Sequence, residues 1–506
     1  MLRSRASEDP GAAGAAGPGP TRSRHERRPR PAARHPPAPR GAGRPPAHPG
    51  RRRVPRRRPA LERRPRRQAR AGRPRPGRRR GRPRGPGRRA LPAAAVGPRR
   101  GHDWAGRALR DGGLVVDLTA LRQVDLDPGT GVVTVGGGAT AADVLAALRP
   151  YDRVVATGVV RAVGLAGLTL AGGYGPLCGR HGLALDNLLG AEVVLADGRR
   201  VTADPAHEAE LFWALRGGGG NFGVVTALRF RTHRLPAALA GMLLFPLDQA
   251  AAVLGGYGAA VREAPDELTV MAGFLPGPAG EPVVFLAPVF TGDDPEAGRP
   301  AVDRLRALGT PLVDQVAPLP YEDVLRMFDG GMADGNHYLL RTRWLPGVSG
   351  PVVAELVAAA RAVTSPYSAI ALHHFHGAAT RVGVAETAFG LRDAHLLAEI
   401  IAVWTPGDDP APHRAWAERT SAALAPHALP GGYPNLLAPD ETDRVRLAYG
   451  SNWDRLRRAK LRYDPRGTFS AVPTLPPATP PTPRVPAADA GAGVAPVDLR
   501  ERSAEG

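Results

Sequence analysis

Apolar and polar residues follow regular periods only after the first hundred positions. The apolar runs 112–118 and 131–136 predict buried strands, and apolar residues on one face of the stretch from Thr140 predict a helix. Residues Ala191 to Leu195 alternate and lead into an Ala-Asp-Gly turn, as in a strand that ends in a hairpin. This part of the chain is therefore expected to mix short strands and short helices.

The same periods continue through the second half of the chain. Glu208–Leu215 predicts a short helix, and Val224–Phe230 predicts a strand. Further strands are predicted at 268–274 and 283–290, and further helices at 249–263, 298–308, 350–363 and 411–425. The stretch 441–463 has aromatic and aliphatic residues at helical spacing and predicts one closing helix.

Two glycine clusters interrupt these elements. The first lies in the block Gly164–Val194 and includes the GGYG turn at 172–175, and the second is Gly217–Gly220, followed by Asn221. Glycine has no Cβ, so its backbone can take a positive φ and its N–H group can approach an anion closely. A single glycine-rich turn more often reflects a bulge or close packing, so either cluster alone is weak evidence for a binding site.

Composition separates the first hundred residues from the rest. They hold 32 arginines and four acidic residues, whereas the remaining residues carry 36 basic and 43 acidic side chains. The net charge of +21 therefore belongs to the N-terminal tract, and the rest of the chain is mildly acidic. Residues 1–98 also contain 20 prolines and almost no aliphatic periodicity, so we expect this tract to be disordered.

Two further interpretations apply to the tract 1–98. Runs such as RRRVPRRRP at 51–59 could neutralise nucleic-acid phosphates, although no Phe, Tyr or Trp precedes Trp104 to stack on a base. Arg, Pro, Gly and Ala are also the residues that a wrong reading frame or an over-extended start produces from GC-rich DNA. Because this composition fits a globular domain poorly, we interpret the tract as the product of a wrong frame or start.

The cysteine count and the apolar runs limit the compartment. Cys178 is the single cysteine, which excludes an internal disulfide and a cysteine-based metal cluster. No apolar run is long enough to span a bilayer, and the first thirty residues lack the apolar core of a secretory signal. The sequence therefore predicts a cytoplasmic protein without a membrane partner.

Five blocks, taken in order, resemble the berberine-bridge-enzyme-like FAD-linked oxidoreductases, which carry the PCMH-type (vanillyl-alcohol-oxidase) FAD domain. The blocks are 101–118, 135–140, 164–194, 210–226 and 449–469. The resemblance covers about residues 101–472 and implies an α+β fold. In that fold, a two-part FAD-binding domain holds an inserted α+β substrate domain, which has an antiparallel sheet with helices.

The resemblance also implies a division of the chain. The FAD-binding domain would occupy 99–235, the substrate domain 236–429, and a C-terminal berberine-bridge-like segment that packs on the flavin 430–472. The disordered basic tract 1–98 precedes them, and a Pro-rich disordered tail, 473–506, follows. The family's first strand–helix–strand unit should precede His102, where the Arg-rich text cannot form it, so the FAD domain is expected to be truncated.

Several residues match the family's cofactor contacts. His102 stands where relatives bond a histidine to the flavin 8α-methyl group, although the usual Arg-Gly-Gly-Gly before it is absent. Backbone N–H groups and side chains around the glycine clusters would line the pyrophosphate and the flavin. The implied FAD-binding residues are Thr169, Leu170, Gly172, Gly173, Tyr174, Gly175, Asn187, Gly219, Gly220, Asn221, Gly223, Val225 and Asn435, together with His102.

The family's Tyr-x-Asn motif appears here as Tyr433 and Asn435. The second tyrosine that serves as a base in several relatives is Leu436, so the base must come from elsewhere. The implied catalytic tyrosines are Tyr433, Tyr367 and Tyr338, with His374 and His376 as further candidate bases. These histidines have no adjacent carboxylate or cysteine, so no metal site is predicted.

The resemblance implies an FAD-dependent oxidase that takes hydride from an alcohol to flavin N5 and returns the electrons to O₂. Its substrate would be a small molecule, either a sugar hydroxyl or a polycyclic secondary metabolite. Two alternatives stay open: an inactive product of a frame-shifted or mis-annotated gene that cannot hold FAD, and a nucleic-acid-binding protein that uses the Arg tract. Nucleic acid is not the expected partner, and the oligomeric state is not predicted.

Overall fold

The structure is a computed structural model that describes residues 101–109, 112–277, 280–329, 334–470 and 475–476, with the backbone of Ala93–Ala94. Apart from these short pieces, the tract predicted to be disordered at 1–98 and the predicted tail at 473–506 lie outside the described residues. The same holds for the strand–helix–strand unit expected before His102. All described residues belong to one unit, Gly85–Gly506.

A five-stranded antiparallel sheet forms the first half of the described chain. Its order is β3-β4-β8-β6-β7, and every neighbouring pair is antiparallel. The strands are β3 (Val124–Asp127), β4 (Val132–Gly136), β6 (Leu188–Val194), β7 (Arg200–Ala203) and β8 (Val224–Arg231). Helices α1 (Ala141–Leu148) and α4 (Ala209–Leu215) bury their apolar faces in the same core.

A nine-stranded antiparallel sheet forms the second half. Its main order is β14-β11-β13-β12-β17-β18-β16, and β10 pairs with both β13 and β15. The strands are β10 (Ala238–Ala240), β11 (Leu243–Pro246), β12 (Leu268–Pro276), β13 (Pro282–Phe290), β14 (Val313–Asp314), β15 (Ala317–Leu319), β16 (His337–Leu345), β17 (Ala369–Phe375) and β18 (His395–Trp404).

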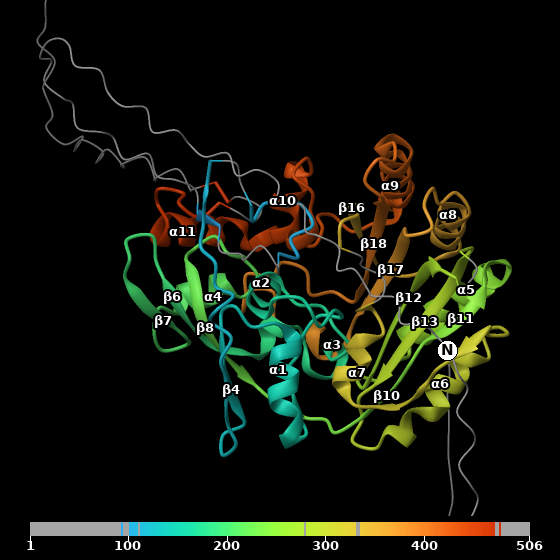
Figure 1. Cartoon of the computed structure of the whole chain (residues 1–506), viewed down its shortest axis with the longest axis horizontal. Coiled ribbons are helices and arrows are strands. Elements are labelled where there is room, and N and C mark those ends of the chain that lie inside the picture. Colours follow the sequence, from blue (N-terminus) through green and yellow to red (C-terminus); the bar gives the residue numbers. More distant parts are fainter. Residues whose placement is uncertain are drawn as a thin grey trace, which may run out of the picture. The chain divides into compact units, whose positions relative to one another are not determined.

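Long helices cover one face of the nine-stranded sheet. Helices α5 (Ala250–Arg262), α8 (Gly350–Arg361) and α9 (Pro410–Leu424) bury aliphatic and aromatic side chains against it. Figure 1 shows these helices on one side of the strands, with the short helices α2 (Leu165–Ala171) and α3 (Cys178–His181) on the way to the first sheet. The other face of the large sheet is therefore turned toward the first glycine block.

The C-terminal segment returns to the five-stranded sheet. The prediction of a single helix at 441–463 is wrong, because this stretch forms two helices, α10 (Thr442–Tyr449) and α11 (Trp453–Tyr463). Gly450 ends α10 with φ of 50°, a conformation that glycine adopts without a steric penalty. Helix α11 packs its buried side, which includes Leu456, in the core beneath α4.

Lys460, the chain's only lysine, anchors α11 to the second glycine cluster. Its fully buried Nζ donates to the backbone oxygens of Asn221, at 2.7 Å, and Phe469, at 2.6 Å. It also donates to the buried carboxylate of Asp464 at 2.6 Å. Three acceptors thus match the three N–H groups of the ammonium, which compensates for its removal from water.

Most strand and helix predictions agree with the structure to within a few residues. The predicted strand 112–118 shrinks to β2 (Leu114–Val115), which pairs in parallel with β1 (Ala93–Ala94). The remaining short elements are β5 (Arg153–Val154), β9 (His233–Arg234), α6 (Arg299–Arg306) and α7 (Tyr321–Arg326). No helix in the described part of the chain has the length and apolar character needed to cross a membrane. The predicted domain boundaries stay predictions.

Candidate active site

The two glycine clusters, far apart in the sequence, meet at one carbonyl group. The Leu170 oxygen at the end of α2 accepts hydrogen bonds from the N–H groups of Gly217 and Gly219, both at 2.9 Å. Gly217 has φ of 126°, and a Cβ there would lie 2.3 Å from the backbone nitrogen of Phe389. Only glycine fits this approach, so the close backbone contact with Phe389 accounts for Gly217.

Tyr433 closes over the first cluster. Its hydroxyl accepts a hydrogen bond from the Gly173 N–H group at 3.0 Å, and a Cβ on Gly172 would lie 2.8 Å from its ring. Burial, together with the nearby charge of Glu399, raises the pKa of Tyr433 above its usual value. The phenol therefore stays protonated at neutral pH and can donate its own hydrogen atom to a further group.

The loop that begins with His102 joins the same region. Arg107 pairs with Asp103 at 3.1 Å and donates to the backbone oxygen of Asn435 at 3.0 Å. The Trp104 ring lies edge-on to the Tyr338 ring at the start of β16, with 5.2 Å between the ring centres. The exposed His102 therefore stands beside both the Tyr-x-Asn loop and the large sheet.

A buried pair of side chains lies next to Tyr433. The Tyr174 hydroxyl and His395 Nε2 are 2.7 Å apart, and His395 Nδ1 is 2.7 Å from the Asp393 carbonyl oxygen. A carbonyl oxygen only accepts, so Nδ1 carries the hydrogen atom and Nε2 accepts from Tyr174. Burial lowers the pKa of His395 to about 4, which keeps the ring neutral and this pair intact at neutral pH.

A carboxylate and an imidazole face the glycine block from the large sheet. Glu399 on β18 and His373 on β17 are one step apart on the same sheet face, and His373 Nε2 lies 3.3 Å from Glu399 Oε2. Both side chains are mostly buried, and the Glu399 charge reaches Tyr433. This pair can accept and share a proton beside the Tyr433 contact.

The structure brings most of the predicted site residues together, and three deserve separate mention. Thr169 is fully buried on α2, and its Oγ1 has no hydrogen-bond partner among the described residues. Asn187 donates both amide hydrogens, to the oxygens of His181 and Leu183, so it has no donor left for a cofactor. Tyr367 lies in the loop between α8 and β17 with half of its side chain exposed.

His374 and His376 are not placed like the Glu399–His373 pair. Their rings stack on each other with 3.7 Å between centres, and His376 is also bonded to Thr269. His395 and Glu399 are the site residues that the sequence analysis missed, because β17 and β18 were not among the predicted strands. Their apolar flanks with β-branched and aromatic residues were the available signal.

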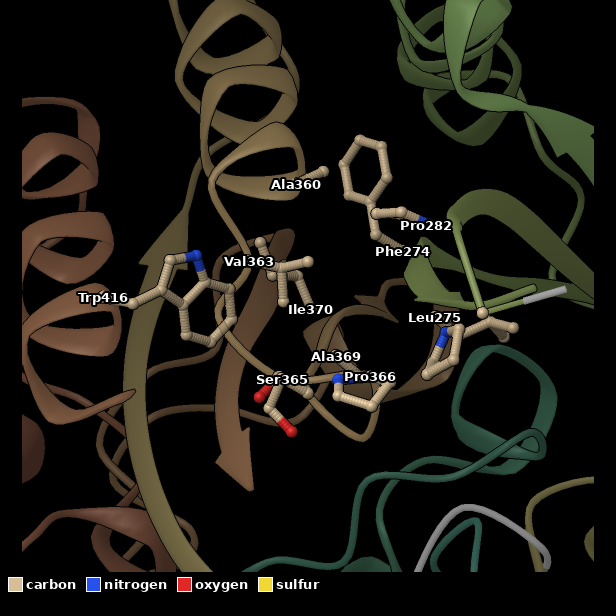
Figure 2. Close-up of a pocket in the computed structure, with 13 residues that line it drawn as sticks. Phe274, Leu275, Pro282, Ala360, Val363, Ser365, Pro366, Ala369, Ile370 and Trp416 are labelled. Carbon is tan, nitrogen blue, oxygen red and sulfur yellow. The ribbon is translucent and has the colours of Figure 1, made fainter. Parts of the chain in front are cut away.

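A cavity on the other side of the large sheet is unrelated to this site. Figure 2 shows Trp416 of α9, Val363 after α8, and Phe274 of β12 around it. Its volume is about 20 Å³, and its lining is almost entirely apolar. It lies on the helix-covered face, away from the glycine loops, so it is a small packing gap in the core of the large sheet.

Two family models match the chain on either side of the large sheet. The FAD binding domain model matches residues 89–204, and the model for berberine and berberine-like proteins matches residues 432–473. The chain is a berberine-bridge-enzyme-like FAD-linked oxidoreductase. The predicted FAD cofactor and the general class, an FAD-linked oxidoreductase, are thereby confirmed.

Full-length relatives support the same family. An FAD-linked oxidoreductase of Gibberella zeae is 29% identical over 74% of this chain and 74% of its own length. One of Dictyostelium discoideum is 27% identical over 71% of this chain and 78% of its own length. The solved structure of 6-hydroxy-D-nicotine oxidase from Arthrobacter nicotinovorans superimposes with a TM-score of 0.69, at 26% identity over 76% of this chain and 87% of that one. The α+β PCMH-type fold is confirmed.

The enzyme's residues fit FAD at the glycine loops. Thr169 Oγ1, fully buried without a hydrogen-bond partner in the described structure, is positioned to bind a polar group of a ligand. Gly172 and Gly217 serve close packing around the site, since a Cβ on either would meet the Tyr433 ring or the Phe389 backbone. The individual FAD contacts, including the covalent bond at His102, stay predictions.

The histidines around the site predict acid sensitivity. Burial lowers the pKa of His181 to about 3 and of His233, His376 and His395 to about 4, and it holds that of His374 well below 6.5. The unfolded chain therefore binds more protons than the folded one below pH 6.5. The stability that these neutral rings provide is complete above pH 6.5 and is lost as the pH falls toward 4.

We expect the urea concentration at the unfolding midpoint to fall steeply between pH 6.5 and 5. At pH 5 the free energy of unfolding should be lower by about 2 kcal/mol for each histidine whose folded pKa is about 4. Carboxylates contribute little in that window, because they titrate below it. The comparison of pH 9 with pH 8, where histidines are neutral in both states, serves as the control and should show little change. A midpoint that stays constant down to pH 5 would contradict the prediction.

Proposed function

We propose that the enzyme oxidises a CH–OH group of a small molecule to a carbonyl group. FAD, when bound, accepts hydride from the substrate carbon at its N5 atom and passes the two electrons to O₂. The substrate loses its hydroxyl proton in the same reaction, so a base must stand beside that hydroxyl. The observation that carries the proposal is the Glu399–His373 pair, which faces the loops that fit FAD.

Glu399 is the proposed base. Its carboxylate can take the hydroxyl proton, and His373, 3.3 Å away, can share it and keep Glu399 oriented. This assignment fills the role left open by Leu436, because a carboxylate from the large sheet replaces the phenol of the Tyr-x-Asn segment. Tyr433 is the proposed catalytic tyrosine that hydrogen-bonds the substrate oxygen, while Tyr338 lies near the start of β16 and Tyr367 in the loop before β17.

The remaining residues would position this centre and exclude water. The Tyr174–His395 pair fills the space between Tyr433 and Phe375 and fixes the Tyr433 ring, which lies 5.0 Å from Tyr174. The ion pair of Arg392 with Asp186, at 2.8 Å and almost fully buried, holds the loop before β18 against the glycine block. Preorganisation of this kind lowers the reorganisation that the reaction requires.

Denaturation of the purified protein tests the flavin part of the proposal. We expect a yellow protein whose colour stays with the polypeptide after acid precipitation, and we expect His102→Ala to release the flavin under the same treatment. His207→Ala, which changes an exposed histidine on another loop, is the matched control and should keep its flavin attached. Colour released from the wild-type protein would contradict the covalent bond, and a colourless protein would favour the inactive alternative.

A screen of alcohols tests the reaction itself. We expect one class of substrate to bleach the flavin under anaerobic conditions and to produce H₂O₂ in air, with one H₂O₂ formed for each carbonyl. Relatives carry names such as (R)-6-hydroxynicotine oxidase and xylooligosaccharide oxidase, so both aromatic and sugar alcohols belong in the screen. A flavin that no alcohol reduces would contradict the proposed function.

A further inference from the structure

A buried hydroxyl group beside the proposed base lacks a partner within the described residues. Thr342 on β16 is fully buried, and its Oγ1 forms no hydrogen bond in the described part of the chain. Such a hydroxyl costs free energy, because it has given up its hydrogen bonds to water without replacement. An unpaired group in an otherwise well-paired strand therefore points to a ligand that supplies the missing partner.

Strand register places Thr342 next to Glu399. The two residues are directly opposed in the β16–β18 pair, and Ala371 opposes Glu399 on its other side. Directly opposed residues of antiparallel strands point to the same face, with their Cβ atoms about 4.5–5.5 Å apart. The threonine hydroxyl group and the carboxylate are therefore neighbours on one face of the large sheet.

The neighbours of Thr342 along β16 show which face this is. Arg343 points to the helix-covered side, where its Nε donates to the Ser421 oxygen of α9 at 2.9 Å. Trp344, one step further, packs in the apolar cluster that contains Tyr174 of the glycine block. Because side chains alternate along a strand, Thr342 shares the face of Trp344 and points toward the glycine block.

The Tyr-x-Asn segment runs along the other side of Thr342. The Leu429 N–H group donates to the Trp344 oxygen at 2.7 Å, so the chain leading to this motif pairs with the outer edge of β16. Arg444 of α10 ties the two together, because its Nη2 donates to the Thr342 oxygen at 2.8 Å and to the Gly431 oxygen at 2.6 Å. Thr342 is therefore flanked by the strand of the proposed base and by the segment of the proposed catalytic tyrosine.

The polar groups gathered here match the hydrogen-bonding capacity of an alcohol. A hydroxyl group has one hydrogen atom to donate and two lone pairs that accept. The Glu399 carboxylate only accepts, whereas the hydroxyl groups of Thr342 and Tyr433 can each donate. The Glu399 charge contributes to the raised pKa of Tyr433, in keeping with their closeness. An alcohol bound among the three would have a partner for every part of its hydroxyl group.

We propose that Thr342 is a further catalytic residue, which donates a hydrogen bond to the oxygen atom of the substrate alcohol. This inference rests on the proposed function and adds a residue outside the glycine loops and the Tyr-x-Asn motif. In the reaction the O–H proton passes to Glu399, the C–H bond breaks with its electron pair passing to FAD as hydride, and a C=O bond forms. Negative charge grows on the oxygen as its proton leaves, so the hydrogen bonds from Thr342 and Tyr433 strengthen toward the transition state.

Thr342→Val tests this role, because valine keeps the branched shape and the strand preference of threonine but has no hydroxyl group. We expect the limiting rate of flavin reduction to fall about 10²-fold, with a much smaller change in the dissociation constant of the substrate. Thr342→Ser restores the hydroxyl group and should recover most of the lost rate. Thr202→Val, at an exposed threonine on β7, is the matched control and should reduce at the wild-type rate.

Two measurements are made on the holoenzyme. Anaerobic stopped-flow absorbance of the flavin gives the reduction rate, with xylobiose as the sugar probe and benzyl alcohol as the aromatic probe. Urea unfolding gives a second readout that needs no substrate. Since Thr342→Val removes a buried hydroxyl group that is unpaired in the described structure, its urea midpoint should equal or exceed that of the wild type.

The outcomes separate this inference from the proposed function. A wild-type reduction rate in Thr342→Val, or equal slowing by Thr342→Val and Thr342→Ser, would overturn the inference and leave the alcohol oxidase in place. A lower urea midpoint in Thr342→Val would also overturn it, because the hydroxyl group would then have its partner within the fold. A wild-type flavin that no alcohol reduces would instead contradict the proposed function, and the role of Thr342 with it.

Discussion

Glu399→Gln is expected to lower the rate of flavin reduction by about 10²–10⁴-fold at saturating substrate, while the FAD content stays unchanged. The amide keeps the size of the side chain but cannot take the hydroxyl proton. Since Glu399 lies on a central pair of the large sheet and touches His373, the substitution leaves the strand pairing intact. Anaerobic stopped-flow absorbance of the flavin band measures the rate directly.

Two further variants make the result for Glu399→Gln interpretable. Glu281→Gln, at an exposed glutamate before β13, is the matched control and should reduce at the wild-type rate. His373→Gln should slow the reaction less than Glu399→Gln, because His373 shares the proton rather than takes it. A wild-type rate in Glu399→Gln, or the same loss in Glu281→Gln, would remove Glu399 from the reaction.

Lys460→Met is expected to destabilise the protein by about 3–5 kcal/mol, the usual cost of removing one partner from a buried ion pair. The carboxylate of Asp464 would stay fully buried with only the N–H groups of Thr468 and Phe469 to compensate it. The backbone oxygen of Asn221 would also lose its donor. Urea unfolding followed by tryptophan fluorescence measures the change, and FAD content should fall because the second glycine cluster loosens.

A second variant separates the ion pair from simple packing. Lys460→Met combined with Asp464→Leu removes both charges, so it should recover part of the stability lost in Lys460→Met. Arg299→Met breaks an exposed pair with Glu296 and is the surface control, with an expected loss of at most about 1 kcal/mol. A double variant less stable than Lys460→Met would show that the charges themselves are not the cause.

Local patterns in the sequence predicted much of the fold. The apolar periods gave α5, α8 and α9 and the strands β12 and β13 to within a few residues, because each has a continuous apolar face. The family resemblance implied that both glycine clusters line one cofactor, and the Leu170 carbonyl group joins them. These features depend on residues close in sequence or on glycine's own geometry.

Contacts between residues far apart in the sequence could not be predicted from local patterns. The bond from Gly173 to Tyr433 spans 260 positions, and the Tyr174–His395 contact spans 221. Glu399 and His373 meet only through the register of β17 with β18, which no periodicity encodes. Asn187 shows the opposite case. Its residue type suits a cofactor contact, but the backbone oxygens of His181 and Leu183 already accept both of its amide hydrogens.

The enclosed Lys460 has a practical consequence for handling the enzyme. Lys460 is the single lysine in the sequence, and its side chain is buried, so the folded surface presents no lysine amine. Dyes, glutaraldehyde and resins that attack lysine amines should leave the native enzyme unlabelled at its side chains. Immobilisation through side-chain amines would therefore need another group, and a lysine introduced at a chosen exposed position would become the single reactive side-chain amine.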